Sequence, residues 1–336
     1  MDNDLVVFAT LPNLGAGPAF YHKLLIGKRP KELGCEVLSD YYFGQGAAPM
    51  SVTGQPLSPC LPNVAVFSYT DVTIESLQPK VIGLGTTCYV TTTDNRTVLK
   101  GYQVWFDDNL VFDYGVTCEE RLAREATVYE HLGKHSRILT CFGLEEEHHG
   151  VHSLRPEMAP LGCIRAYIQK HAENTPPIQH RLQMALDVAT GLSYVYLRGE
   201  MPCDLSCTNL FVFDKLRIKL GDFVGALLEG FDFEWDQTHE SRYHLPSRGR
   251  EYDDVPLMKR ELFALGSAIY EITVWKRSFS ELNDDDDDDE VDNNYAKEKF
   301  LPLDGNVARD IIWNCWAEAY ATAQEVAHDL KSCGSS

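Results

Sequence analysis

Cys203-Asp204-Leu205-Ser206-Cys207-Thr208-Asn209, together with Leu220-Gly221-Asp222-Phe223 further along, is the part of the sequence that decides the fold. It holds an acid, an amide five residues later and, after a predicted hairpin, a second acid. Asp204 can orient or accept the proton of an attacking hydroxyl, and Asn209 and Asp222 offer the hard oxygen ligands that magnesium prefers. Each residue alone would be an ordinary turn residue. Their order and spacing together indicate a metal and proton-transfer site.

Helices surround this stretch in the second half of the chain. Residues 179–197 have an amphipathic pattern that predicts a helix directly before it, and residues 262–274 are so uniformly apolar that they predict a buried helix. Two short runs, 210–213 and 216–220, predict the strands of the hairpin between the two acids. Residues 308–330 are again helical in pattern.

A glycine-rich hairpin and a strand that ends in lysine lie on the amino-terminal side. Glycine lets backbone amides approach phosphate oxygens closely, and Gly83 and Gly85 are spaced for that role, although the pattern also fits an ordinary hairpin turn. Lys100 ends the next predicted strand, from which its ammonium can reach a bound phosphate. Further strands are predicted near 138–144 and 151–154.

Glu125 is the expected partner of that lysine. Within a predicted helix over 119–132, Glu125 shares the apolar face of Leu122 and Tyr129. A charge on a buried face needs an opposite charge, and Lys100 is the natural one. The alternative is a solvated glutamate at the rim of the helix.

The order of the elements predicts the fold class. Strands come first and helices later, with one hairpin between helices, which indicates an α+β protein with a small sheet-rich lobe and a larger helical lobe. Residues 1–75 are rich in glycine and proline and have little periodicity, so we expect a partly ordered extension there.

The composition and net charge indicate which binding partners and which cellular location to expect. The net charge of −20, part of it in the acidic run 284–292 that predicts a solvated loop, argues against nucleic acid and anionic membranes as partners. No run reaches the ~18 apolar residues of a membrane span, and Met1 to Leu5 lack the basic flank of a signal peptide. Ten cysteines without a C-x-x-C pair favour a reducing, intracellular location, cytoplasmic or nuclear.

At these positions the chain resembles the eukaryotic protein kinase superfamily, over roughly residues 76–331. The resemblance implies a two-lobed fold with an N-lobe at 76–157 and a C-lobe at 158–331. Phe263-Ala264-Leu265-Gly266 is similar to the buried helix of the large lobe, and Cys315-Trp316 to a late helix of the family. The matched motif residues are Gly83, Gly85 and Val90 of the Gly-rich loop, Lys100 and its helix partner Glu125, Asp204, Leu205 and Asn209 of the catalytic loop H-R-D-L-x-x-x-N, and Asp222 and Phe223 of D-F-G.

The resemblance also implies ligands and roles. ATP and Mg²⁺ are the expected cofactors, and a serine or threonine hydroxyl of a protein substrate is the expected acceptor of the γ-phosphate. Val90 and Val98 would cover the adenine, Phe211 would lie beneath it, and residues 157–162 would form the hinge. The expected catalytic residues are Asp204, Lys100 and Glu125, the expected ATP-binding residues Gly83, Gly85, Val90, Val98, Lys100 and Phe211, and the expected metal ligands Asn209 and Asp222.

Several residues depart from the family pattern. Without the catalytic-loop arginine, an activation-loop phosphate lacks its usual docking point, so phosphorylation there is not the expected switch. Without the catalytic-loop lysine, less positive charge meets the developing anion, and slower chemistry is expected. The replacements are Cys88 for the third loop glycine, Pro202 and Cys203 for the His and Arg of the catalytic loop, Ser206 for its lysine, and Val224 for the D-F-G glycine.

A second group of departures concerns the large lobe. The A-P-E element reads Leu245-Pro246-Ser247, and the late-helix arginine that would pair with its glutamate aligns with Ala323. One buried ion pair of the family is therefore predicted to be absent as a whole, since one partner left alone would be costly. The aspartate of the buried helix is Glu261.

Three functions fit these residues. The first is an active protein kinase, because the five groups that would touch ATP, metal and the attacking hydroxyl are all present. The second is a nucleotide-binding pseudokinase that acts as a scaffold or regulator, which the departures favour. The third is a small-molecule kinase, which shares the Asp, Asn and Asp pattern but fits the two large-lobe matches less well.

Overall fold

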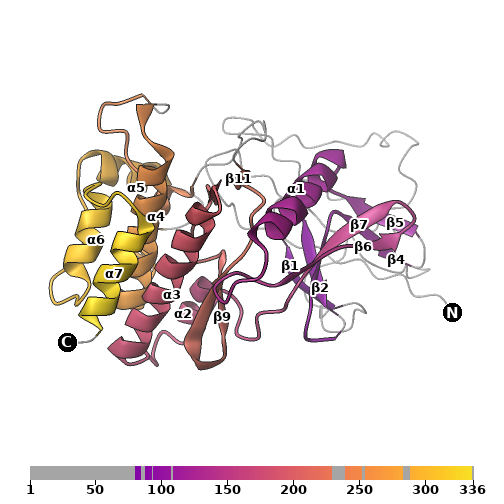
Figure 1. Cartoon of the computed structure of the whole chain (residues 1–336), viewed down its shortest axis with the longest axis horizontal. Coiled ribbons are helices and arrows are strands. Elements are labelled where there is room, and N and C mark those ends of the chain that lie inside the picture. The colour runs from indigo at the N-terminus through magenta and orange to yellow at the C-terminus, as the bar shows by residue number, and fades with distance from the viewer. Residues whose placement is uncertain are drawn as a thin grey trace, which may run out of the picture.

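The computed structural model describes residues 80–84, 88–92, 94–106, 109–228, 239–251, 254–282 and 288–334. The predicted extension at 1–75 and Gly85 lie outside these residues. The described residues form a small lobe built on an antiparallel sheet and a larger helical lobe (Figure 1). The predicted α+β, two-lobed fold is therefore confirmed.

The small lobe is built on a five-stranded sheet with the strand order β1-β2-β3-β7-β6. Lys100 lies on a central strand, because it pairs with Val90 on one side and with Leu154 on the other. The strands are β1 (Lys80–Leu84), β2 (Tyr89–Thr92), β3 (Leu99–Gly101), β6 (Cys141–His148) and β7 (Val151–Pro156). The predicted strand near 138–144 thus begins later and runs further.

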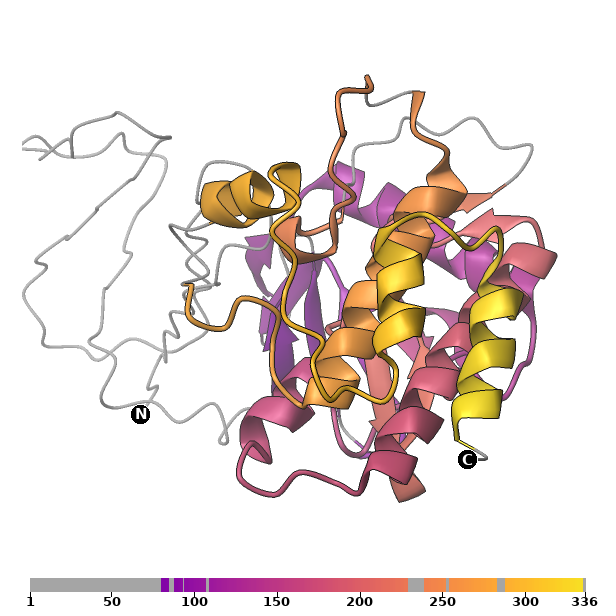
Figure 2. The same ribbon diagram turned by 90° about the vertical axis from the view of Figure 1, so that its left-hand side faces the viewer.

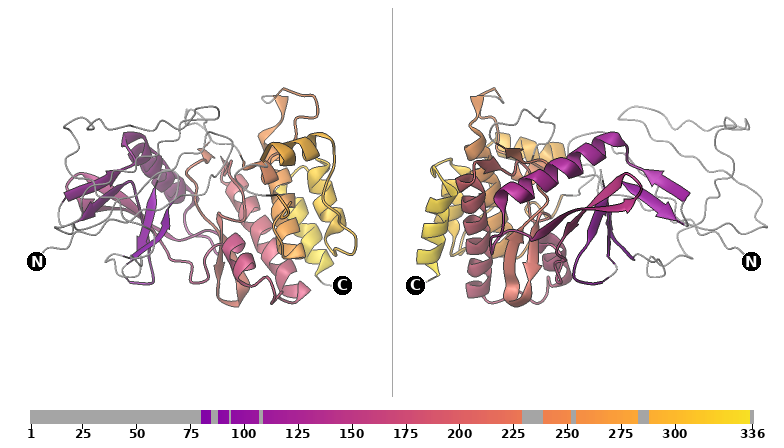
Figure 3. Two further views of the ribbon diagram at one scale, coloured as in Figure 1. Left: turned by 180° about the vertical axis from the view of Figure 1, so that it is seen from behind. Right: turned by 45° about the vertical axis from the view of Figure 1, so that its right-hand side comes forward.

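One helix and one hairpin complete this lobe. Helix α1 (Val116–Leu132) lies along one face of the sheet (Figure 3). Glycines with positive φ, Gly115 and Gly133, bound it at both ends, where a side chain would be strained. A separate hairpin of β4 (Gln103–Phe106) and β5 (Asn109–Asp113), which the sequence analysis did not predict, precedes α1.

The large lobe is helical, with two short pairs of strands between α3 and α4. Helices α3, α4, α6 and α7 pack side by side (Figure 2). The helices are α2 (Ile164–Lys170), α3 (Ile178–Leu197), α4 (Leu257–Val274), α5 (Asp288–Ala296), α6 (Arg309–Trp316) and α7 (Ala323–Cys333). The strand pairs are β8 (Glu200–Met201) with β11 (Leu227–Leu228), and β9 (Leu210–Phe213) with β10 (Arg217–Leu220).

Helix α4 forms the centre of the large lobe, as its apolar sequence predicts. Gly266 allows α6 to approach closely, because a Cβ added there would lie 2.5 Å from the Cβ of Cys315. The indole of Trp316 is fully buried and donates to Ser267 Oγ at 3.2 Å. The two large-lobe segments that resemble kinase sequences therefore pack against each other.

The prediction of a solvated loop over 284–292 is wrong in its second half, because α5 begins at Asp288. Val291 and Tyr295, one helical turn apart, are fully buried and attach the helix to the core. Glu290 and Asp292 remain exposed. Charge density alone predicted a loop, but two apolar anchors at helical spacing stabilise a helix.

None of the helices in the described ranges is long and apolar enough to cross a membrane.

Candidate active site

Lys100, Glu125 and Asp222 meet where β3, α1 and the segment after β10 converge, and we call them the phosphate-side cluster. Lys100 Nζ lies 2.7 Å from Glu125 Oε2 and 2.8 Å from Asp222 Oδ1. The Lys100 and Glu125 side chains are 8% and 2% exposed, whereas that of Asp222 is 39% exposed. The predicted pairing of Lys100 with Glu125 is present, and the solvated alternative for Glu125 does not apply.

This cluster keeps the lysine charged. Burial would lower the pKa of Lys100, but the neighbouring carboxylates of Asp222 and Glu125 outweigh it and hold that pKa well above its ordinary value. The second oxygen of Glu125 accepts a hydrogen bond from the backbone N–H of Phe223 at 3.1 Å. The ammonium therefore stands charged beside the half-exposed Asp222, where it can meet an anionic ligand.

Tyr129 supports the cluster from α1, and sequence reasoning missed this role. Its hydroxyl accepts a hydrogen bond from the backbone N–H of Asp222 at 3.3 Å, and its ring packs edge-on against Phe223 at 5.1 Å between centroids. Asp222 itself has φ 58°, a left-handed conformation that costs free energy in a non-glycine residue. Tyr129 lies four residues after Glu125 on the same helix face, a spacing that could have indicated its position.

Asp204 and Asn209 meet within the predicted catalytic loop. Asn209 Nδ2 donates to the backbone oxygen of Asp204 at 2.8 Å and to its Oδ2 at 3.1 Å. Burial raises the pKa of Asp204 to about 7; the charge of His239 lowers it, and Asp222 and Glu240 raise it further. Asp204 is thus an oriented carboxyl group that can exchange a proton near neutral pH.

The loop substitutions occupy uncharged, internal positions. Cys203 has φ 59°, is fully buried, and directs its thiol to the backbone oxygen of Met201 at 3.4 Å. Ser206 is 2% exposed, and its Oγ lies 2.6 Å from Thr208 Oγ1. Neither side chain brings a positive charge to Asp204.

Residues predicted to contact adenine come from both lobes. Val90 of β2 and Val98 before β3 are half-buried in the small lobe, and Phe211 of β9 is half-buried in the large lobe. In the connection between the lobes, the backbone N–H groups of Glu157 and Met158 donate to Thr140 and Arg96. The backbone N–H of Ala159 makes no backbone hydrogen bond within the described residues, which leaves a donor in the predicted hinge.

Gly83 lies on β1 and faces the side chain of Val90 across the β1–β2 pair; a Cβ at Gly83 would be 3.5 Å from that of Val90. Cys88, which stands where the family has a third glycine, is 6% exposed. Burial raises the pKa of its thiol to about 12, so the thiol stays protonated. With Gly85 outside the described residues, the phosphate role of the glycine loop stays a prediction.

Comparison of the sequence with known proteins supports the kinase interpretation of this site. Residues 113–246 match the family described as protein tyrosine and serine/threonine kinase. This part of the chain belongs to the protein kinase superfamily.

Its relatives include several kinds of kinase. Mitogen-activated protein kinase kinase kinase 20 of Arabidopsis thaliana is 24% identical over 62% of this chain and 61% of its own length. The serine/threonine/tyrosine-protein kinase HT1 of the same plant is 32% identical over 24% of this chain, and human tyrosine-protein kinase FRK is 23% identical over 57%. The matched part is about a fifth of the length of HT1 and 39% of that of FRK.

The ion pair of the family pattern is absent at Ser247 and Ala323, as the sequence predicts, and charged residues near them in the sequence form a different one. Arg248 Nη1 and Arg250 Nη2 lie 2.6 and 2.8 Å from Glu318 Oε1, and Arg250 Nη1 lies 2.8 Å from its Oε2. The two arginines directly follow the Leu245-Pro246-Ser247 element, and Glu318 lies between α6 and α7. We call these three residues the rear joint; its charges are opposite to those of the family pair.

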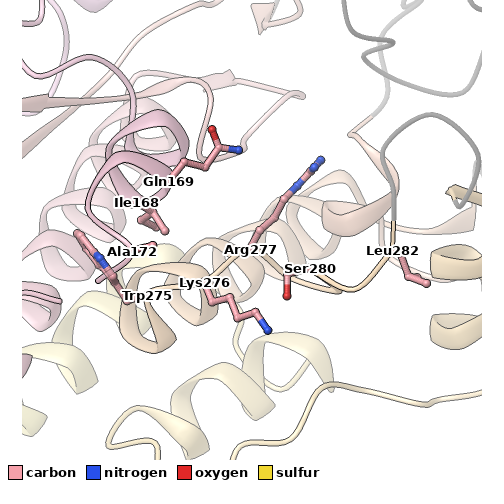
Figure 4. Close-up of a pocket in the computed structure, with 8 residues that line it drawn as sticks. All are labelled: Ile168, Gln169, Ala172, Trp275, Lys276, Arg277, Ser280 and Leu282. Carbon is pink, nitrogen blue, oxygen red and sulfur yellow. The ribbon is translucent and has the colours of Figure 1, made fainter. Parts of the chain in front are cut away.

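A pocket of about 340 Å³ opens elsewhere on the large lobe, between α2 and the segment after α4 (Figure 4). Its lining residues are Ile168, Gln169, Ala172, Trp275, Lys276, Arg277, Ser280 and Leu282. None of the predicted site residues lines it, so it is separate from the phosphate-side cluster.

Proposed function

We propose that this chain is an active protein kinase that binds ATP with magnesium and transfers the γ-phosphate to a serine or threonine hydroxyl of a protein substrate. The observation that carries the proposal is the phosphate-side cluster beside the Asp204–Asn209 pair. A buried, charged lysine held by two carboxylates and a carboxyl group with a pKa near neutrality are what phosphate binding and hydroxyl activation require.

The proposed reaction is an in-line transfer. The hydroxyl oxygen of the substrate forms a bond to the γ-phosphorus while the bond from that phosphorus to the β–γ bridging oxygen breaks, which releases ADP. Asp204 orients the hydroxyl and accepts its proton, and Lys100 offsets negative charge on the phosphates. Glu125 keeps the ammonium of Lys100 in position.

Magnesium fits the donor set of this site. Asp222 Oδ2 makes no hydrogen bond within the described residues, and Asn209 Oδ1 receives only a long contact of 3.5 Å from Thr208 Oγ1. Among the described residues no group of three His, Cys, Asp or Glu side chains forms a metal cage. Magnesium commonly binds through one or two protein oxygens plus phosphates and water, so Asn209 and Asp222 would hold it when ATP binds, and it would offset phosphate charge.

A nucleotide-binding pseudokinase is the second candidate. The buried contact of Ser206 with Thr208 favours it, because no cation stands where kinases have a lysine beside the transferring phosphate. The two candidates agree on ATP binding and differ in phosphate transfer.

We also propose an intracellular location. The eight cysteines of the described residues are free thiols, which is the usual state in a reducing compartment.

The deciding experiment is transfer of labelled phosphate from ATP to the chain itself and to casein. Asp204→Asn should reduce transfer by about 10²- to 10⁴-fold while ATP with magnesium still raises the melting temperature. The matched control is Asp214→Asn, at an exposed carboxylate of the hairpin, which should retain full activity. Transfer that survives in Asp204→Asn would contradict the role of Asp204. ATP stabilisation without any transfer by the native chain would establish the pseudokinase.

A further inference from the structure

The pocket between α2 and the segment after α4, which we call the α2 pocket, has a fixed apolar wall (Figure 4). Trp275 is buried and has φ 63°, a left-handed conformation that costs free energy in a non-glycine residue. Its indole N–H donates to the backbone oxygen of His171 at 3.0 Å, and its ring packs edge-on against Tyr167 at 6.0 Å between centroids. These contacts join the end of α4 to the end of α2, so the wall is formed without a ligand.

Polar and positively charged side chains line the rest of the α2 pocket. Gln169 comes from α2, whereas Lys276, Arg277 and Ser280 come from the segment after α4 (Figure 4). Lys276 is exposed, and its ammonium makes no ion pair within the described residues. In a chain whose net charge is −20, positive charge beside an apolar wall favours a ligand that is anionic and partly apolar.

The α2 pocket is connected to the predicted catalytic loop. The backbone N–H of Arg165, at the start of α2, donates to the backbone oxygen of Cys207 in that loop at 3.1 Å. The guanidinium of Arg165 donates two hydrogen bonds to the carboxylate of Glu240, at 2.8 and 2.7 Å. Oε2 of the same carboxylate lies 3.6 Å from Nη2 of Arg277, which lines the pocket. A protein segment that presents its hydroxyl at the catalytic loop can therefore reach the pocket.

Arginines of the chain itself offset the acidic side chains along this path. Glu271 is 1% exposed on α4, and its Oε1 lies 3.7 Å from Arg165 Nη2. Burial would raise the pKa of Glu240, but the charge of Arg165 outweighs it and holds that pKa below its ordinary value. Glu240 and Glu271 thus offer no open site to a basic residue of a substrate. The charged residues that line the pocket are Lys276 and Arg277, so a basic residue would meet like charge there.

We propose that the α2 pocket binds an acidic segment of the protein substrate, one that carries glutamate or aspartate and an apolar side chain near the acceptor hydroxyl. Lys276 and Arg277 would pair with a carboxylate of that segment, Gln169 and Ser280 would donate hydrogen bonds to it, and its apolar side chain would pack against Trp275. The inference rests on the proposed kinase function and names its substrate class.

The test compares two synthetic peptides as phosphate acceptors. Each has one serine with a leucine and several glutamates around it, and in the second peptide glutamines replace the glutamates. We expect KM for the glutamate peptide to be about 3- to 10-fold lower than KM for the glutamine peptide. This preference should disappear in Lys276→Glu and persist in Lys276→Arg, with KM for ATP unchanged in both variants. Lys134→Glu, at an exposed lysine of the small lobe, changes the net charge equally and is the matched control.

Calorimetric titration with the same peptides, alanine replacing the serine, measures binding without transfer. Equal affinity for the two alanine peptides, or a preference that survives in Lys276→Glu, would overturn the inference alone. A preference that is lost equally in Lys134→Glu would also overturn it, because net charge rather than the pocket would then be its cause. A native chain that binds the acidic peptide but transfers no phosphate to its serine form would instead overturn the proposed function, and with it the substrate role of the pocket.

Discussion

The phosphate-side cluster and the rear joint are both built on ion pairs, but they relate differently to the kinase pattern. Lys100, Glu125 and Asp222 are the residues that the kinase motifs predict, and Lys100 Nζ lies 2.7 Å from Glu125 Oε2 and 2.8 Å from Asp222 Oδ1. At the rear joint, Arg250 and Glu318 carry charges opposite to those of the kinase pair, yet they join the same parts of the large lobe.

The difference follows from what each region must do. A residue that meets a phosphate must present a particular group at a particular place, so lysine cannot be exchanged for glutamate there. A joint between two segments needs only opposite charges within reach, and either side can carry the positive one. Arg165 and Glu240 belong to the second kind, because they link α2 to the segment before α4.

The largest expected effect is at Lys100. Lys100→Met and Lys100→Arg should both abolish the rise in melting temperature given by ATP with magnesium, since arginine does not reproduce the compact ammonium of lysine. Lys100→Met should also destabilise the chain by about 3–5 kcal/mol, because Glu125 is left buried without its partner. Thermal unfolding with and without ATP measures both effects.

Two further variants sharpen that result. Lys100→Met combined with Glu125→Leu should recover much of the lost free energy of unfolding but not the rise in melting temperature with ATP. The double variant therefore separates the contribution of Lys100 to stability from its contribution to ATP binding. Lys170→Met, at the exposed end of α2, is the control and should behave as the native chain does. A full ATP shift in Lys100→Met would remove Lys100 from the binding site.

A smaller effect is expected at Glu318. Glu318→Gln should destabilise the chain by about 1–3 kcal/mol, because its partly buried carboxylate accepts hydrogen bonds from two arginines. Asp310→Asn is the matched control, since Asp310 is 85% exposed beside Arg309 and surface pairs contribute little. Urea unfolding measures both variants, and a double-mutant cycle with Arg250→Gln isolates the pair. A coupling free energy of zero in that cycle would mean that the contact between Arg250 and Glu318 does not stabilise the fold.

Sequence alone predicted the regions that conform to a pattern and missed those held by contacts between distant segments. Lys100, Glu125 and Asp222 were found from an apolar helix face and from motif spacing, and both signals are local. Nothing local indicates that Arg250 meets Glu318, because the two are distant in sequence and neither lies in a motif. The helix at 288–296 was missed for a related reason: its stability comes from the burial of Val291 and Tyr295 in a core that the sequence does not display.

The smallest expected effect is a difference in pH dependence between two carboxyl groups. Hydrogen bonds from Arg250 and Arg248 hold the pKa of Glu318 below its ordinary value, whereas burial raises the pKa of Glu200 to about 7. Glu200 is fully buried on β8, and neither of its oxygens makes a hydrogen bond within the described residues. His131 Nε2 lies 3.9 Å away, and Arg198 lowers the pKa of Glu200 only in part.

Because the pKa values of Glu318 and Glu200 are shifted in opposite directions, the two groups change the stability in opposite directions as the pH rises. A carboxyl group with a lowered folded pKa contributes stability above its unfolded pKa of about 4.5, and loses it as pH falls through the folded value. The melting temperature of the native chain should therefore exceed that of Glu318→Gln at neutral pH, and the gap should close below about pH 4. Glu200 loses its proton more readily in the unfolded chain, so native stability falls as pH rises from about 4.5 to about 7. Glu200→Gln removes that loss, so the melting temperature of this variant should rise relative to that of the native chain across this pH window. If the melting temperatures of both variants depended on pH in the same way, hydrogen bonds from arginine would not distinguish Glu318 from a buried acid that lacks them.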